Sequence, residues 1–190
     1  DCHRSLVSGM WLAVLMIPMV MGMVWALEGI LPSLGVDREV LRATQPYLHT
    51  LLWSAPPLLI YFALRRYLQA LHIARPVMIT LLTANLVNLA GNWVLVLGHL
   101  GAPRLGAEGA AWATCFSRVY MAAALAYVLW KRDPKILHIS WRPETARMWA
   151  LLKLGAPAAG QMAVEIGVFA TVTVLVSRLN ATALAGHQIA

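Results

Sequence analysis

The sequence predicts an all-α polytopic membrane protein, and three observations support this fold class. Of the 190 residues, 60% are hydrophobic and only 12% are charged, with a mean hydropathy of +0.68. A soluble domain needs more polar surface than this composition provides. The apolar residues form runs of about 20, the length that crosses the hydrocarbon core of a bilayer as a helix. Nearly all basic residues lie between these runs.

Five apolar runs are predicted to be transmembrane helices, at about residues 8–31, 46–64, 77–98, 107–130 and 154–177. A further run begins near Ala183. The second span contains Pro56 and Pro57 after Trp53. Because proline lacks an N–H donor, this pair predicts a bent or locally unwound helix.

The fourth span opens with small residues at a spacing that lets helix backbones approach closely in lipid, namely Gly106, Gly109, Ala110 and Ala113. This pattern predicts tight bundling with a neighbouring helix. Cys115 lies within the same span, far from Cys2. Two distant cysteines suggest neither a disulfide nor a metal site, and Cys115 is expected to act as a small buried hydrophobic side chain.

The basic residues lie unevenly on the two sides of the membrane. If the helices alternate in direction, one side carries ten of the fifteen: Arg4, Arg65, Arg66, Arg75, Lys131, Arg132, Lys135, Arg142, Arg147 and Lys153. Cytoplasmic loops carry an excess of Lys and Arg, so this side is predicted to be cytoplasmic, with spans one, three and five running outward. The net charge of +7 therefore indicates topology, and nucleic acid is not an expected partner.

Residues 132–153 form the longest connection and are predicted to be a cytoplasmic linker between two halves. Residues 1–131 hold the first four spans, and residues 154–190 hold the fifth and the start of the next. Within the linker, residues 143–152 have the amphipathic pattern of a helix at the membrane interface, with Trp149 beside Arg147.

Polar side chains within the third and fourth spans form a candidate site. Asn85, Asn88 and Asn92 are spaced i, i+3 and i+7, which places three amides on one stripe of a helix. From a rise of about 1.5 Å per residue, Asn92 lies near the depth of Thr114 and Asn88 near that of Arg118, so these side chains are expected to form one cluster. Two interpretations stay open: interhelical hydrogen bonding without a ligand, or a binding site.

Two ionisable residues lie inside the predicted spans, Arg118 and Glu165. A charge at this depth is costly, so Arg118 must be paired or hydrated, and Glu165 must carry a proton or be neutralised by a cation. Gln161 lies one turn from Glu165 on the same helix face. A proton or sodium site at Glu165 is the preferred interpretation, because ionisable residues in membranes usually serve function. The alternative is a carboxyl kept neutral by a hydrogen bond from a neighbouring helix.

Five segments of the chain, in order, resemble the multidrug and toxic compound extrusion (MATE) transporters, in particular the bacterial sodium-coupled or proton-coupled branch. They are "WSAPPLLIYFALRRYLQALHIARPVM", "LVNLAGNWVLVLG", "RLGAEGAAWATCFSR", "LLKLGAPAAGQMAVEIGVFA" and "ALAGHQIA". Together they extend over most of the chain. The resemblance implies two six-helix lobes around a central cavity, of which this chain would hold helices three to seven and the start of the eighth.

The resemblance also implies roles for particular residues. Asn88 and Asn92 match the polar pair of the family's fifth helix, and Thr114 matches a threonine of its sixth, all near a cation site in the first lobe. Glu165 matches the acidic residue of the seventh helix that is linked to cation coupling, and Gln188 matches a glutamine of the eighth. The first-lobe site also needs a carboxylate from the first helix, outside this chain. That carboxylate is a hypothetical partner for Arg118.

The function implied is export of amphipathic organic cations across the bacterial inner membrane, in exchange for sodium ions or protons. The expected partners are these small molecules, the lipid bilayer and the rest of the chain's own helices, with no cofactor beyond the coupling ion and no metal beyond transient sodium. An intramembrane enzyme is not expected, because the histidines His49, His99 and His187 lie near span ends. A lipid-linked oligosaccharide flippase, which would need more basic residues than Arg118, and a non-transporting membrane scaffold are the alternatives.

Overall fold

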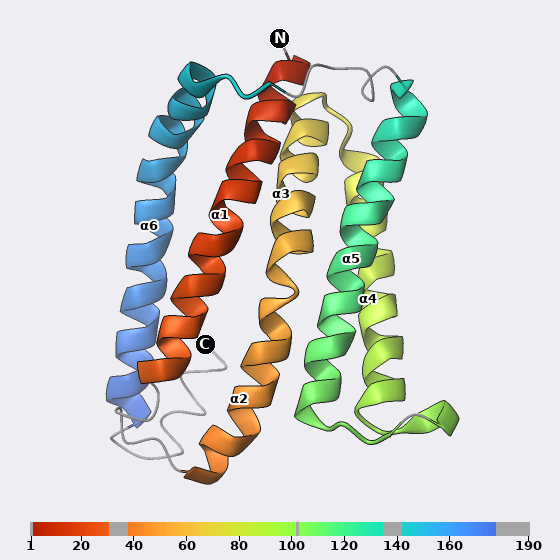
Figure 1. Cartoon of the computed structure of the whole chain (residues 1–190), viewed down its shortest axis with the longest axis vertical. Coiled ribbons are helices and arrows are strands. Elements are labelled where there is room, and N and C mark those ends of the chain that lie inside the picture. The colour runs from red at the N-terminus through yellow and green to blue at the C-terminus, as the bar shows by residue number, and fades with distance from the viewer. Residues whose placement is uncertain (1, 31–37, 102, 135–141, 178–190) are drawn as a thin grey trace. The chain divides into compact units, whose positions relative to one another are not determined.

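The computed structural model describes residues 2–30, 38–101, 103–134 and 142–177, and every regular element in these ranges is a helix (Figure 1). This confirms the all-α fold class. In chain order the elements are α1 (Cys2–Ile30), α2 (Arg38–Leu52), α3 (Ala55–Ala70), α4 (Ala74–Leu95), the short helix η2 (His99–Gly101), α5 (Ala107–Arg132) and α6 (Thr145–Ser177). The chain divides into two units, Asp1–Glu144 and Thr145–Ala190, which are described separately below.

Three described helices are long and apolar enough to cross a membrane: His3–Ile30, Ala74–Leu95 and Ala107–Arg132. They contain most of the first, third and fourth predicted spans. The second span is a bent pair, Thr44–Leu52 with Ala55–Ala70, whose axes differ by 46°. The bend lies directly before Pro56 and Pro57, as the missing N–H donors predict.

The first unit is organised around α5, which packs against α2, α3 and α4, while α1 packs against α3 (Figure 1). Its hydrophobic core lies toward the end of the bundle that holds the N-terminus of α1. The buried members are Leu6, Tyr61, Leu64, Tyr67, Leu68, Val77, Ala84, Met121, Leu125 and Leu129. These residues come from α1, α3, α4 and α5, so one core joins four helices.

The closest approach in this unit is between α4 and α5. A β-carbon added at Gly109 would lie 2.6 Å from the carbonyl oxygen of Leu95, and one added at Gly91 would lie 2.9 Å from the β-carbon of Ala113. Both distances are too short for a real side chain, so only glycine fits at either position. The close helix packing that the small-residue spacing predicts is therefore confirmed for α4 and α5.

Polar contacts join the ends of three helices at the end of the unit that holds the N-terminus. Tyr67 Oη lies 3.0 Å from His3 Nδ1, and His3 Nε2 lies 3.4 Å from a carboxylate oxygen of Asp133. Arg4 also donates to Glu144 at 3.2 Å. The α1, α3 and α5 ends that these contacts join carry many of the basic residues assigned to the cytoplasmic side.

The second unit contains the long helix α6, which runs without interruption from Thr145 to Ser177. Residues 143–152 were expected as a separate amphipathic piece; their helical part is instead the first section of the helix that contains span 154–177. Pro157 lies inside α6. A proline within a helix removes one backbone hydrogen bond and favours a kink, but long apolar helices tolerate it.

Candidate functional site

Two asparagines of α4 form the centre of the candidate site in the first unit. The side-chain amide of Asn92 donates to Asn88 Oδ1 at 3.0 Å, and both residues are half-buried. The Oδ1 atom of Asn92 is buried and accepts no hydrogen bond from any described residue. Since a buried carbonyl oxygen without a donor is unfavourable, this atom is a ready ligand for a cation or a water molecule.

Thr114 of α5 is held at the level of this pair by the close contact of α4 with α5. Gly91 touches Ala113, so their sequence neighbours Asn92 and Thr114 lie at similar depth in the bundle, as expected from helical rise. The Thr114 hydroxyl donates to the Ala110 carbonyl of its own helix at 2.9 Å. Its oxygen retains acceptor capacity, because a hydroxyl has two lone pairs.

The single cluster expected from the sequence is not formed by hydrogen bonds. Asn85 is exposed and makes no hydrogen bond to a described residue. Arg118 bonds to neither asparagine; its Nη1 donates to the hydroxyl of Ser54, at the break between α2 and α3. The two asparagines share one hydrogen bond along α4, while the long Arg118 side chain reaches from α5 to the buried Ser54 hydroxyl at the break.

Ser54 is therefore a partner that the sequence analysis missed. It is fully buried and directly precedes α3. The available signal was a hydroxyl residue immediately before Ala55 and two prolines, where an interrupted helix offers polar groups without helical partners. Cys115 is buried as expected, and its Sγ additionally donates to the Thr50 carbonyl at 3.3 Å.

In the second unit, Glu165 and Gln161 lie one turn apart on α6, on the same helix face. Both side chains are exposed and make no hydrogen bond or ion pair with any described residue. Their apolar neighbours are exposed too, with Val164 at 67% and Ile166 at 65%. Gln188 lies outside the described residues.

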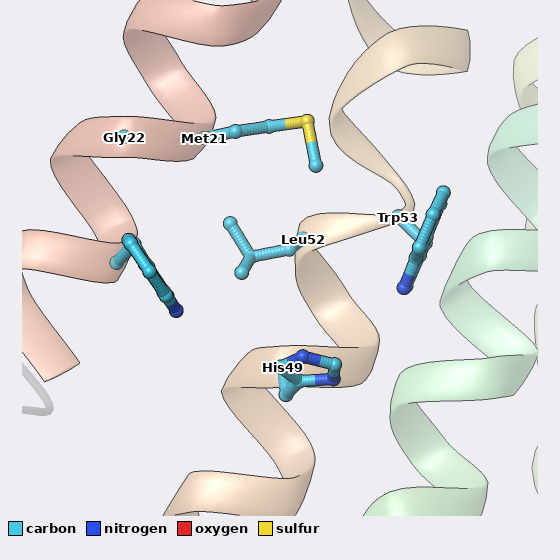
Figure 2. Close-up of a pocket in the computed structure, with 6 residues that line it drawn as sticks. Met21, Gly22, His49, Leu52 and Trp53 are labelled. Carbon is cyan, nitrogen blue, oxygen red and sulfur yellow. The ribbon is translucent and has the colours of Figure 1, made fainter.

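An apolar cavity of about 320 Å³ lies between α1 and the end of α2 (Figure 2). Its lining consists of Met21, Gly22, Trp25, His49, Leu52 and Trp53. In Figure 2 the Leu52 side chain extends from α2 toward α1, and the Met21 side chain extends from α1 toward the break. The cavity is open on one side, where Trp25 and Trp53 are 70% and 61% exposed, and His49 is the titratable residue of its lining. Its residues come from two segments that are distant in the sequence, 21–25 and 49–53, so no local pattern predicts it.

Comparison with known proteins agrees with this architecture. The MatE family model matches residues 2–94. The chain is 35% identical over 189 residues to the multidrug resistance protein NorM of Aliivibrio fischeri, covering 96% of this chain and 41% of that protein. It is 35% identical over 192 residues to a probable multidrug resistance protein NorM of Geobacillus kaustophilus, covering 98% and 42%.

A third relative, the probable multidrug resistance protein NorM of Mesorhizobium japonicum, is 32% identical over 194 residues, which cover the whole of this chain. The chain spans only 41% to 42% of the length of these relatives. Its apolar helices, its order of segments and these matches agree with each other. The chain belongs to the MatE family.

Proposed function

We propose that the protein is a secondary active exporter of amphipathic organic cations in the bacterial inner membrane, driven by inward movement of sodium ions or protons. The observation that supports this proposal most is the buried Oδ1 atom of Asn92, which has no donor among the described residues. The similarity to relatives that are named multidrug resistance protein supports it independently. In this proposal residues 1–131 belong to one lobe, residues 132–153 link the lobes, and residues 154–190 begin the other.

The asparagine pair supplies neutral oxygen ligands to the coupling ion. Because Asn92 donates its amide to Asn88, its carbonyl oxygen is held in one orientation. Hard cations such as sodium are bound by carbonyl, hydroxyl and carboxylate oxygens, by analogy with other oxygen-ligand sites. Thr114 at the same depth adds a hydroxyl oxygen, whereas Arg118 is bonded to Ser54 and stays out of the ligand set.

Glu165 is the titrating or cation-binding group of the second lobe in this proposal. A carboxylate in an apolar helix is costly when charged and unpaired, so binding a proton or a sodium ion there stabilises the site. Gln161, on the same face, can orient the carboxyl or contact the substrate. The exchange then follows from two conformations that differ in their affinity for ion and drug.

Substituting Glu165→Gln in the full-length protein tests the coupling directly. Efflux of a cationic dye from membrane vesicles is measured under an imposed sodium gradient and, separately, an imposed proton gradient. We expect the gradient-driven rate to fall at least about tenfold in the variant, because the amide cannot bind or release a proton and lacks the negative charge that balances a bound cation.

The matched control is Glu144→Gln, the same chemical change at a partly exposed carboxylate that pairs with Arg4 outside the apolar spans. It should retain wild-type efflux under both gradients. Unchanged gradient-driven efflux in Glu165→Gln contradicts the proposed role of this residue. Equal loss in both variants shows that the effect comes from a general loss of folded protein.

A further inference from the structure

We propose that two side chains of α5, Arg118 and Cys115, hold the break between α2 and α3 in one geometry. These two side chains are called the latch below. In this role they set the bend of the helix pair and, through it, the shape of the apolar cavity beside the break. They act as positioning residues, since neither lines the cavity itself. The proposal does not depend on the exporter function, because it concerns the geometry of a single unit.

The backbone at the break lacks two helical hydrogen bonds. In a continuous helix the carbonyls of Leu52 and Trp53 would accept the N–H groups of positions 56 and 57, but both positions are proline. The last turn of α2 instead closes by short-range bonds, from Trp53 N–H to the Thr50 carbonyl at 3.2 Å and from Ser54 N–H to the Leu51 carbonyl at 3.0 Å. The pair is left with a bend of 46° that few backbone bonds define.

Two side chains of α5 contact this segment next to the missing bonds. Cys115 donates from Sγ to the Thr50 carbonyl, and Arg118 donates from Nη1 to the Ser54 hydroxyl. The two donors are three positions apart, so they project from one face of α5. The contacted positions lie in the last turn of α2 and directly before α3, and together the two donors hold the region of the break.

The Ser54 hydroxyl links the latch to the backbone. It donates to the Leu51 carbonyl at 2.6 Å while accepting from Arg118, so a chain of hydrogen bonds runs from the guanidinium into the last turn of α2. Ser54 and Thr50 are buried, at 0% and 6% exposure, so bulk water does not compete for these groups. A hydrogen bond from a charged donor is among the stronger types, especially away from water.

α5 is suited to this role because its other side is fixed to α4. Gly109 of α5 lies against the backbone at Leu95, and Gly91 of α4 lies against Ala113. The break is therefore held against a rigid pair of helices and not against a mobile neighbour. The side chains of Cys115 and Arg118 transmit that position to the break, together with the packing of α2 and α3 against α5.

The bend matters because the residues next to the break line the cavity. Leu52 and Trp53, at the end of α2, line one side of the cavity, while Met21 and its neighbours on α1 line the other (Figure 2). A change in the bend moves the first wall relative to the second. The latch thus sets the distance between the end of α2 and the facing part of α1.

Distance measurement across the bent pair tests the latch. Spin labels are attached at Gln45 and Ala70, exposed positions on either side of the break, in full-length protein with Cys2→Ser and Cys115→Ser, because serine keeps a donor toward Thr50. We expect one narrow distance distribution in this background. Ser54→Ala and Arg118→Met should each broaden it to at least twice its width, and the double variant should add nothing further, since both changes remove the same bond.

Ser117→Ala is the matched control, because it removes a buried serine bond of α5 that does not involve the break. It should leave the distribution unchanged. Ser54→Ala keeps the test decisive if Arg118→Met does not fold. A narrow, wild-type distribution in folded Ser54→Ala overturns the proposal, and so does equal broadening by Ser117→Ala.

Discussion

Small and polar residues make contacts between helices in the α4–α5 pair, whereas the described glycines of α6 and Thr171 do not. In the pair, Gly91 and Gly109 lie against the backbone or β-carbon of the partner helix, and Ser117 donates across the interface. In α6, a β-carbon added at Gly155, Gly160 or Gly167 meets nothing within 4 Å, and Thr171 donates only within its own helix. All three helices are predominantly apolar and contain glycine and hydroxyl residues.

The comparison shows that a glycine or a hydroxyl in an apolar helix makes no fixed contribution to the free energy of unfolding. Its contribution depends on whether another backbone lies against it. Interfaces in lipid depend on close packing and on satisfied polar groups, since the lipid tails are as apolar as the side chains. The same substitution made in the two regions should therefore give different results, and four experiments test how far the difference extends.

The largest expected effect is at the closest contact. Gly109→Ala should destabilise the folded protein by about 1–3 kcal/mol, because the added methyl group meets the Leu95 carbonyl and forces the helices apart. Gly160→Ala in α6 should change stability by less than about 0.5 kcal/mol, since surface-type substitutions have small effects. Thermal unfolding of the full-length protein in detergent measures both. Equal losses of stability in Gly109→Ala and Gly160→Ala would show that α6 is packed as tightly at Gly160 as α5 is at Gly109.

The next experiment asks whether the tightly packed region also binds the coupling ion. Sodium should raise the unfolding temperature of the wild type by mass action. Asn92→Leu should weaken the apparent sodium affinity about tenfold, or about 1.4 kcal/mol, because it removes one oxygen ligand and the donor to Asn88. Asn85→Leu, on the same helix but exposed, should leave the sodium effect intact. A sodium shift that survives Asn92→Leu argues against a site on α4.

A smaller effect is expected from the matched hydroxyls. Ser117→Ala should cost about 0.5–1.5 kcal/mol, the usual net value of one hydrogen bond, because its bond joins two helices in a buried position. Thr171→Ala removes a bond within α6 only and should be close to neutral. Chemical denaturation or thermal unfolding distinguishes the two. A larger loss at Thr171 would indicate that α6 has an interface of comparable tightness.

The smallest effect is expected at the end of the first unit. Arg4 and Glu144 form an ion pair at 3.2 Å, with side chains 68% and 40% exposed. Solvent screening limits such pairs, so Arg4→Gln should change stability by no more than about 0.5 kcal/mol and less at high salt. Unfolding measured at low and at high ionic strength checks this. A loss above about 1 kcal/mol would mean that the ion pair at this end contributes as much to stability as the packing of α4 against α5.

Much of the fold follows from local patterns. The apolar runs predict the long helices α1, α4 and α5, Pro56–Pro57 predicts the bend, and the small residues of α5 predict close packing. Element boundaries were less predictable: α6 begins at Thr145 and continues through the expected interface segment. Helix periodicity cannot mark where an amphipathic stretch joins an apolar one, because both have the same backbone.

The candidate site was predictable only in part. Spacing placed Asn88 and Asn92 on one stripe, and they do bond to each other. Spacing also suggested that Arg118 would join them, but it bonds to Ser54. A long flexible side chain can reach several acceptors, and depth along a helix does not reveal which one lies within reach. The roles of Glu165, Gln161 and Gln188 stay predictions.

The sequence by itself determined the fold class, the bend and the residue types available for a site, because hydrophobic run length, proline chemistry and charge are properties of single segments. Only the tertiary structure decided the partners: Gly109 against Leu95, Cys115 against Thr50 and Arg118 against Ser54. The physical reason is that hydrogen bonds and close contacts depend on distances of a few tenths of an ångström between helices. Those distances are set by how the helices pack and not by the sequence of any one of them.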